Sequence, residues 1–169
     1  MKTLILMRHA KASRPEGVGD FDRPLSDRGA EAARAVGAWL RENGHLPQKA
    51  LVSNAARTRE TWEALGLEDD CPLRLAKELY DAASGQVLGT ISRQEANVLL
   101  VIGHNPSIES LATYLLREET VPRELAKWKP GTCAVIEFDI ADWKSVAATP
   151  GRLVDYATPR GLGVAAGAE

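Results

Sequence analysis

The stretch Leu4-Ile5-Leu6-Met7-Arg8-His9-Ala10-Lys11-Ala12-Ser13 decides the fold class of this chain. Its apolar residues 4–7 form a short continuous run, which is typical of a central strand covered on both faces in a parallel sheet. Arg8 and His9 stand where this strand ends, and in open α/β sheets ligands bind outside the carboxyl ends of the strands. A permanent cation beside an imidazole at that place indicates anion chemistry with a nucleophile or a proton carrier. Arg-His pairs are common, so these two residues alone do not decide the function.

The composition is that of an ordinary globular protein. The chain has 169 residues, of which 44% are hydrophobic and 26% charged, enough for a domain with a proper core. A net charge of -2 gives no support for nucleic-acid binding. Cys71 and Cys133 show neither metal-ligand spacing nor a disulfide framework. The first apolar run stops too early for a secretion signal, and no stretch reaches membrane-spanning length, so we expect a cytoplasmic protein with no membrane partner.

Strands and helices alternate along most of the chain. Apolar runs predict strands at residues 4–7, 50–53, 97–103 and 133–139, with a minor strand at 72–75 and the strand 133–139 near an edge. Helical spacing predicts helices from the N-cap Ser26 to about residue 43, and then at 54–65, 84–91 and 107–115. Gly37 inside the first helix costs roughly 1 kcal/mol against alanine. This order predicts a single α/β domain over residues 1–169, a three-layer sandwich with a mostly parallel sheet and helices on both faces.

Three of the predicted strands end in a basic or imidazole residue. Arg8 and His9 follow the first strand, Arg57 lies at the strand-to-helix junction after residues 50–53, and His104 follows residues 97–103. If these strands are neighbours, the side chains converge on one pocket. Arginine grips a phosphoryl group with its planar fork, and histidine is a suitable nucleophile near neutral pH. The helix that begins at Ser107 adds backbone N–H groups, so the pattern indicates phosphoryl transfer.

The chain resembles the histidine phosphatase superfamily, and most closely its small SixA-like phosphohistidine phosphatase branch. The resemblance covers nearly the whole chain and implies a phosphoglycerate mutase-like fold. Its motifs occur in order: Arg8-His9-Ala10, Asp22-Arg23-Pro24-Leu25-Ser26-Asp27-Arg28-Gly29, Ser53-Asn54-Ala55-Ala56-Arg57-Thr58-Arg59-Glu60-Thr61 and Gly103-His104-Asn105-Pro106. The wider superfamily usually has glycine after the Arg-His pair, and alanine at this position resembles members of the SixA-like branch.

The resemblance implies a role for each matching residue. His9 would be the nucleophile and become a transient phosphohistidine, with Arg8, Arg57 and His104 around the phosphate and with no metal or cofactor. A general acid contributes roughly 10²–10⁴-fold to such a reaction. By resemblance Glu78 is its leading candidate, with Asp81 and Asp22 behind it. Asp22 and Arg23 are also candidates for the phosphate rim, where Arg23 either reaches the phosphate or anchors its loop by a salt bridge.

The spacing also bears on the substrate. The stretch between Arg57 and His104 is short and is filled by the predicted helices and strands, which leaves little material for a large cap insertion. An open pocket favours a phosphate carried on a protein side chain, above all phosphohistidine, and small phosphoesters remain the alternative. The absence of a cap speaks against a phosphomutase.

Two further classes stay open on the residues alone. A metal hydrolase would need more ligands than His9 and His104, which lack the H-x-x-x-H pairing. A non-catalytic phosphate-binding module would keep the arginines without turnover. The remaining histidine, His45, follows a helix end and is predicted to be a solvated loop residue.

Overall fold

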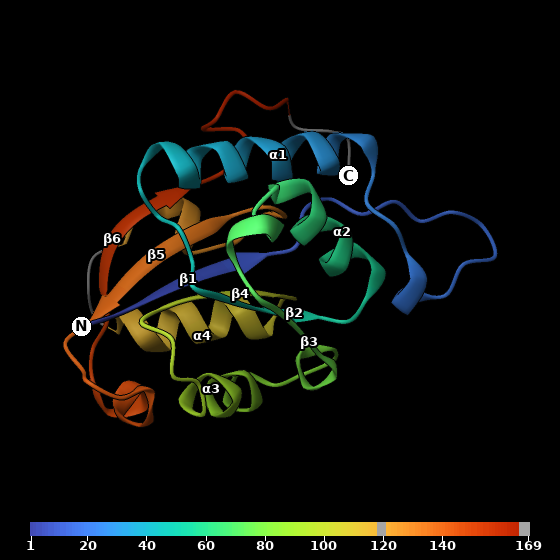
Figure 1. The fold of residues 1–169 in the computed structure, drawn as a ribbon. Coiled ribbons are helices and arrows are strands. Elements are labelled where there is room, and N and C mark those ends of the chain that lie inside the picture. The colour runs from blue at the N-terminus through green and yellow to red at the C-terminus, as the bar shows by residue number, and fades with distance from the viewer. Residues whose placement is uncertain (118–120, 166–169) are drawn as a thin grey trace.

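A six-stranded sheet forms the centre of the molecule in the computed structural model, which describes residues 1–117 and 121–165 (Figure 1). The strands are β1 (Lys2–Arg8), β2 (Lys49–Ser53), β3 (Leu73–Ala76), β4 (Val98–Gly103), β5 (Cys133–Phe138) and β6 (Arg152–Ala157), in the order β3-β2-β4-β1-β5-β6. The pairs β1–β4, β4–β2 and β2–β3 are parallel, whereas β1–β5 and β5–β6 are antiparallel. The prediction of a mostly parallel sheet is confirmed.

Helices cover both faces of this sheet. The α-helices are α1 (Asp27–Glu42), α2 (Ala56–Leu65), α3 (Ser84–Ser92) and α4 (Ser107–Leu116). Figure 1 shows α1 and α2 above the sheet and α3 and α4 below it. Within residues 1–117 and 121–165, no helix has both the length and the apolar character needed to cross a bilayer.

The alternation of side chains along β1 explains why the sheet is covered twice. Leu4 and Leu6 pack into the core on the α3–α4 side, whereas Ile5 and Met7 pack with residues of α1 and α2. All of these side chains are 0% exposed. A continuous apolar run is therefore what a strand in this position requires, because successive residues face opposite layers.

The structure contains a strand that the sequence did not predict. β6 forms the edge of the sheet beside β5, so β5 lies one place inside the edge. Short 3-10 helices fill several connections: η1 (Asp20–Asp22), η2 (Glu68–Asp70), η3 (Lys77–Leu79), η4 (Arg123–Leu125) and η5 (Trp143–Ala148). The stretch between Arg57 and His104 consists of α2, η2, β3, η3, α3 and β4 with their turns, and these described residues include no large cap.

The long polar loop before α1 is closed at its base. Ala12 and Leu25 form an isolated antiparallel bridge, and Ser13 N donates to Pro24 O at 2.9 Å. Ser26 caps α1 as predicted, because its hydroxyl accepts a hydrogen bond from Gly29 N at 3.0 Å. The loop therefore leaves the sheet and returns to it at one point, and it carries η1 outward beside the ends of the strands (Figure 1).

Gly37 is required by the packing of α1 against α2. A Cβ atom added to Gly37 would lie 2.0 Å from the carbonyl oxygen of Leu65. We therefore expect Gly37→Ala to lower the free energy of unfolding by about 1–3 kcal/mol, although alanine is the better helix former. Gly89→Ala in α3 is the matched control, since its Cβ would meet only Arg93 Nη1 at 3.8 Å. Chemical denaturation measures both variants, and an unchanged or raised stability of Gly37→Ala would contradict the close approach.

Candidate active site

The parallel register of the sheet brings the predicted residues together at one edge. Arg8 pairs with Gly103 across β1 and β4, so His9 and His104 both follow directly after paired residues. Their ring centroids lie 5.3 Å apart. Arg57 lies in the first turn of α2, which follows β2, the other neighbour of β4. His9, Arg57 and His104 are each only 7% exposed.

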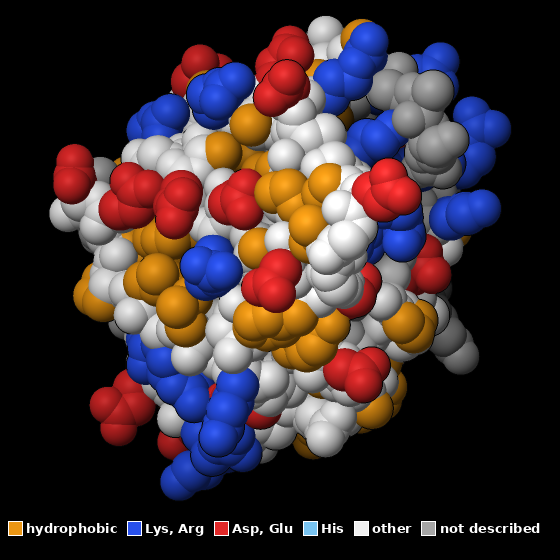
Figure 2. All heavy atoms as spheres, turned by 90° about the vertical axis from the view of Figure 1, so that its right-hand side faces the viewer, with side chains coloured by type: hydrophobic (Ala, Val, Ile, Leu, Met, Phe, Trp, Pro, Cys, Tyr) orange, Lys and Arg blue, Asp and Glu red, His pale blue; other side chains and the backbone are white. Residues whose placement is uncertain are grey.

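This edge of the sheet faces the viewer in Figure 2. Hydrophobic patches lie there among acidic and basic side chains, and the colour of histidine does not stand out because His9 and His104 lie beneath the surface. Acidic and basic side chains are thus both present on this face. The Arg57 guanidinium lies beneath it, buried in the first turn of α2.

The hydrogen bonds of His9 fix its tautomer. Its Nδ1 lies 2.7 Å from the carbonyl oxygen of Ala10, which can only accept, so Nδ1 carries the proton and donates. Burial lowers the pKa of His9 to about 3, with the charges of the neighbouring His104, Arg8 and Arg57 adding to the effect. The ring is therefore neutral at pH 7, and Nε2 keeps an unshared electron pair.

The second imidazole is held by β2. His104 Nε2 lies 2.7 Å from the hydroxyl of Ser53, the last residue of that strand. His104 Nδ1 is buried and has no hydrogen-bond partner among residues 1–117 and 121–165. Burial, and then the charge of Arg57, lower the pKa of His104 to about 4. Ser53 therefore orients this ring. The buried Nδ1 of His104 remains available to a ligand.

Arg8 is anchored from the far side of the sheet. Its Nη1 donates to the carbonyl oxygen of Trp128 at 2.8 Å, and Asn105 Nδ2 donates to the same oxygen at 3.2 Å. Trp128 itself is 1% exposed. This shared acceptor joins the strand end of β1 to the turn before α4, so the guanidinium and the second imidazole keep a fixed relation.

Arg57 makes contact with the loop that carries η1. Its Nη1 donates to the backbone oxygen of Asp20 at 2.8 Å, and its Nη2 donates to Asp20 Oδ2 at 3.2 Å. Arg57 Nε is buried without a hydrogen-bond partner in the described part of the chain. A carboxylate thus occupies the outer edge of the Arg57 fork, while a donor on its inner side is unsatisfied.

Asp20 and Tyr80 belong to the site although the sequence did not single them out. The Tyr80 hydroxyl donates to Asp20 Oδ2 at 2.6 Å, and Arg23 Nη1 lies 3.2 Å from Asp20 Oδ1. These hydrogen bonds, led by that of Tyr80, lower the pKa of Asp20 to about 2. The position of Asp20 in a long loop after a strand end was the available sign that it belongs to the site. No periodicity in the sequence pointed to Asp20 or to Tyr80.

The structure places Arg23 as a loop anchor. Its Nε donates to Ser13 O at 3.2 Å, in addition to the ion pair with Asp20. This is one of the two roles that the sequence left open for Arg23. Asp20 lies between Arg23 and Arg57 and pairs with both. Contact of Arg23 with the phosphate rim therefore remains a proposal.

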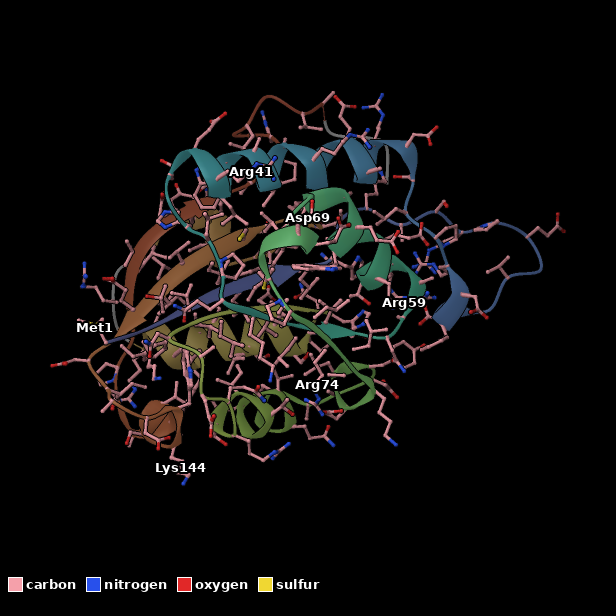
Figure 3. All side chains as sticks on the ribbon, in the orientation of Figure 1. Met1, Arg41, Arg59, Asp69, Arg74 and Lys144 are labelled. Atoms are coloured by element: carbon pink, nitrogen blue, oxygen red, sulfur yellow. The ribbon has the colours of Figure 1, made fainter. Side chains whose placement is uncertain are left out.

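The candidates for the general acid lie at the margin of the cluster. Glu78 pairs with Arg74, a residue of β3 labelled in Figure 3, at 2.6 Å. Hydrogen bonds from its own backbone and from Arg74 lower the pKa of Glu78, which keeps its carboxyl ionised at neutral pH. Asp22 and Asp81 are exposed. The geometry thus favours none of the three, and their role stays a prediction.

His45 differs from its prediction as a solvated residue. Its Nε2 lies 2.9 Å from Asp155 Oδ2 of β6, and its ring lies 5.6 Å from that of Trp39. The side chain is 17% exposed. The unpredicted edge strand supplies the partner, so no local pattern pointed to this contact.

The depressed pKa values of the two site histidines predict a dependence of stability on pH. The unfolded chain takes up a proton on His9 near pH 6.5, whereas the folded chain does so only near pH 3. The unfolded state therefore binds more protons in this window, and stability falls as the pH is lowered through it, by about 1.4 kcal/mol per pH unit for each such proton. Between pH 7 and 4, the free energy of unfolding of His9→Asn should fall less steeply than that of the parent protein, as measured by chemical denaturation. Parallel profiles would contradict the pKa of His9.

Removal of the Asp20 carboxylate should strengthen the binding of inorganic phosphate. The Asp20 carboxylate occupies one donor of Arg57, Nη2, and repels an incoming anion, but it is half exposed, so the expected gain in affinity is about 2–5-fold. Product inhibition by inorganic phosphate measures this effect in Asp20→Ala. Glu16→Ala, which removes an exposed carboxylate of the same loop, is the control and should leave the inhibition constant unchanged. Weaker inhibition of Asp20→Ala would instead mean that Asp20 orients Arg57 for the anion.

The fold and site together define a class of protein: an α/β protein whose parallel strands bring two arginines and two histidines to one edge of the sheet. The model of the histidine phosphatase superfamily, branch 1, matches residues 4–97, more than half of the chain. The chain therefore belongs to the histidine phosphatase superfamily and is a phosphatase.

Relatives of similar length support this assignment. The uncharacterized protein Rv1276c of Mycobacterium tuberculosis is 36% identical over 160 residues, which cover 91% of this chain and all of that protein. The solved structure of SixA from Nakamurella multipartitia, a candidate phosphohistidine phosphatase, is 34% identical with a TM-score of 0.83, covering 94% of this chain and 96% of that one. A second such SixA, from Agrobacterium tumefaciens, is 26% identical with a TM-score of 0.79, covering 94% and 98%. The predicted phosphoglycerate mutase-like fold is confirmed.

Proposed function

We propose that this chain is a protein phosphohistidine phosphatase that transfers the phosphoryl group to His9 and then to water. Arg8, Arg57 and His104 surround the phosphate and stabilise the charge on its equatorial oxygens. Residues 1–169 act as one histidine phosphatase domain. The reaction needs no metal and no cofactor, since the arginines supply the positive charge.

The state of His9 is the observation that carries this proposal. A neutral ring whose Nδ1 donates to Ala10 O presents Nε2 as a nucleophile without a preceding proton transfer. Two buried atoms, Arg57 Nε and His104 Nδ1, have no partner among the described residues. Leaving such groups unsatisfied costs about 1–3 kcal/mol each. A phosphate oxygen would accept from Arg57 Nε, and from His104 Nδ1 in the tautomer in which the Ser53 hydroxyl donates to Nε2.

Each step of the proposed reaction balances. His9 Nε2 attacks phosphorus with its electron pair, and the bond from phosphorus to the substrate nitrogen breaks in line with the attack. The electron pair of that bond stays on the substrate ring nitrogen. When the other nitrogen of that ring is protonated, the ring leaves as a neutral imidazole, which is a better leaving group than an alkoxide and depends less on a general acid. Water then attacks phosphorus and the bond to His9 Nε2 breaks, which returns the neutral ring and releases inorganic phosphate after loss of a proton.

The open architecture supports a large substrate. The described residues between Arg57 and His104 form no cap, so no large insertion from this part of the chain covers the strand ends. A phosphorylated side chain on another protein can approach such an edge. The similarity to SixA proteins supports the same substrate class.

A comparison of substrates tests the proposal. We expect kcat/KM for a histidine-phosphorylated protein to exceed that for every member of a panel of small phosphoesters by at least about 10-fold. The same protein phosphorylated on serine is the matched control for protein docking. Equal or faster turnover of a small phosphoester would favour the alternative substrate class, and loss of activity in a chelator would contradict a metal-independent reaction.

A further inference from the structure

An aromatic pair borders the two groups proposed to hold the outer phosphate oxygens. The Tyr80 ring lies 5.5 Å from the His104 ring in an edge-to-face arrangement and 6.0 Å from the guanidinium carbon of Arg57. On its other side it meets Phe21 of η1, with the ring centroids 5.1 Å apart and an interplanar angle of 86°. Phe21 is 37% exposed. We call Phe21 and Tyr80 the aromatic wall.

Several contacts hold the aromatic wall in place. The Tyr80 hydroxyl donates to Asp20 Oδ2, so the residue before Phe21 ties the two rings together. Asp81, directly after Tyr80, has φ of 54°, a left-handed conformation that is uncommon outside glycine. Strained backbone of this kind persists where the surrounding structure determines it, and it is concentrated at functional sites.

The wall lies where a leaving group must pass. In-line attack by the buried His9 puts the leaving group on the opposite side of phosphorus, toward solvent. Tyr80 is half-buried and Phe21 is exposed, so their rings offer surface on the outer side of His104 and Arg57. Phe21 leaves apolar surface in water beside the Tyr80 ring, and a bound ring would cover it.

We propose that the aromatic wall selects substrates whose leaving group is a flat aromatic ring. This inference rests on the proposed function of the same site and names its specificity-determining residues. The shared chemistry is a planar ring bonded to the phosphoryl group, either the imidazole of a phosphohistidine or a phenol. Such a ring can stack or meet edge to face with Phe21 and Tyr80, whereas an aliphatic or unsubstituted leaving group gains nothing from them.

The test measures a ratio of kcat/KM values in the full chain. Phosphoimidazole and phenyl phosphate carry a ring, and phosphoramidate serves as the reference without one. The intrinsic reactivity of each substrate cancels when the ratio in a variant is divided by that in the parent protein. Phe21→Leu and Tyr80→Leu remove a ring and keep apolar bulk, whereas Tyr80→Phe removes only the hydroxyl. Val18→Ala in the same loop is the control, since Val18 is similarly exposed at 39%.

Loss of either ring should reduce the preference for both ring substrates by roughly 3–10-fold, mainly through KM. Tyr80→Phe and Val18→Ala should keep the preference of the parent protein, even where Tyr80→Phe changes the absolute rate through Asp20. An unchanged preference in both leucine variants would contradict the proposed selection by the aromatic wall. A drop in preference for only one of the two ring substrates would contradict it as well.

These outcomes are separable from a failure of the proposed function. If the parent protein turned over phosphohistidine proteins and the leucine variants kept its preference for ring substrates, only the proposed role of the aromatic wall would be wrong. If the parent protein did not turn over phosphohistidine proteins, the proposed function would fail, whatever the ratio measured with phenyl phosphate.

Discussion

Replacement of His9 by alanine is expected to reduce turnover by about 10⁴-fold or more, because it removes the group that we propose forms the covalent intermediate. His9 follows β1 at its end, and its backbone N–H donates to Gly103 O at 3.0 Å, a bond that alanine keeps. The fold should therefore survive. Steady-state kinetics on a histidine-phosphorylated protein, together with a circular dichroism spectrum, measure both expectations.

His45→Ala is the matched control for this variant. His45 is a partly buried histidine that pairs with Asp155 of β6, away from the strand ends that carry the site. Its loss should affect stability slightly and leave the chemistry intact. Retention of full activity in His9→Ala would rule out His9 as the nucleophile, whatever the result for His45.

Replacement of Arg57 by alanine is the second large expected effect. The residue supplies a buried guanidinium next to both imidazoles, and removal of one such donor to a developing anion costs about 10²–10³-fold in rate. Arg57→Lys should recover only part of this loss, because an ammonium keeps the charge but not the planar fork. The loss should appear in kcat/KM for phosphohistidine and phosphoester substrates alike.

Arg34→Ala provides the control for a lost arginine. Arg34 is exposed on α1 and should leave kcat/KM unchanged. Arg59 is a less suitable control although it shares α2 with Arg57, because its Nε donates to Asn54 O at 3.0 Å and so supports the turn before the helix (Figure 3). Equal activity of Arg57→Ala and Arg34→Ala would exclude Arg57 from the phosphate site.

The central residues could be predicted because their positions follow from simple chain geometry. Arg8, His9 and His104 come directly after apolar strands, and Arg57 lies in the first turn of the helix that follows another. In a parallel sheet the carboxyl ends of neighbouring strands share one edge. Local sequence therefore predicted the residues, and the strand order β2-β4-β1 in the structure brings them to one edge.

The outer part of the site could not be predicted in this way. Asp20 and Tyr80 lie in irregular segments without periodicity, and only tertiary contact brings the Tyr80 hydroxyl to Asp20. β6 was missed because Arg152 and Asp155 interrupt its apolar pattern, as an edge strand with exposed positions allows. Gly37 shows the reverse case, where a residue that disfavours a helix is demanded by the approach of α2.

A rapid-quench experiment with a radiolabelled phosphoryl donor tests the covalent role of His9 most directly. The account predicts a labelled protein intermediate that is labile in acid and stable in alkali, as a phosphoramidate is, with the label on the peptide that contains His9 and none in His9→Ala. An acid-stable adduct, or a label that persists when His9 is replaced, would contradict it.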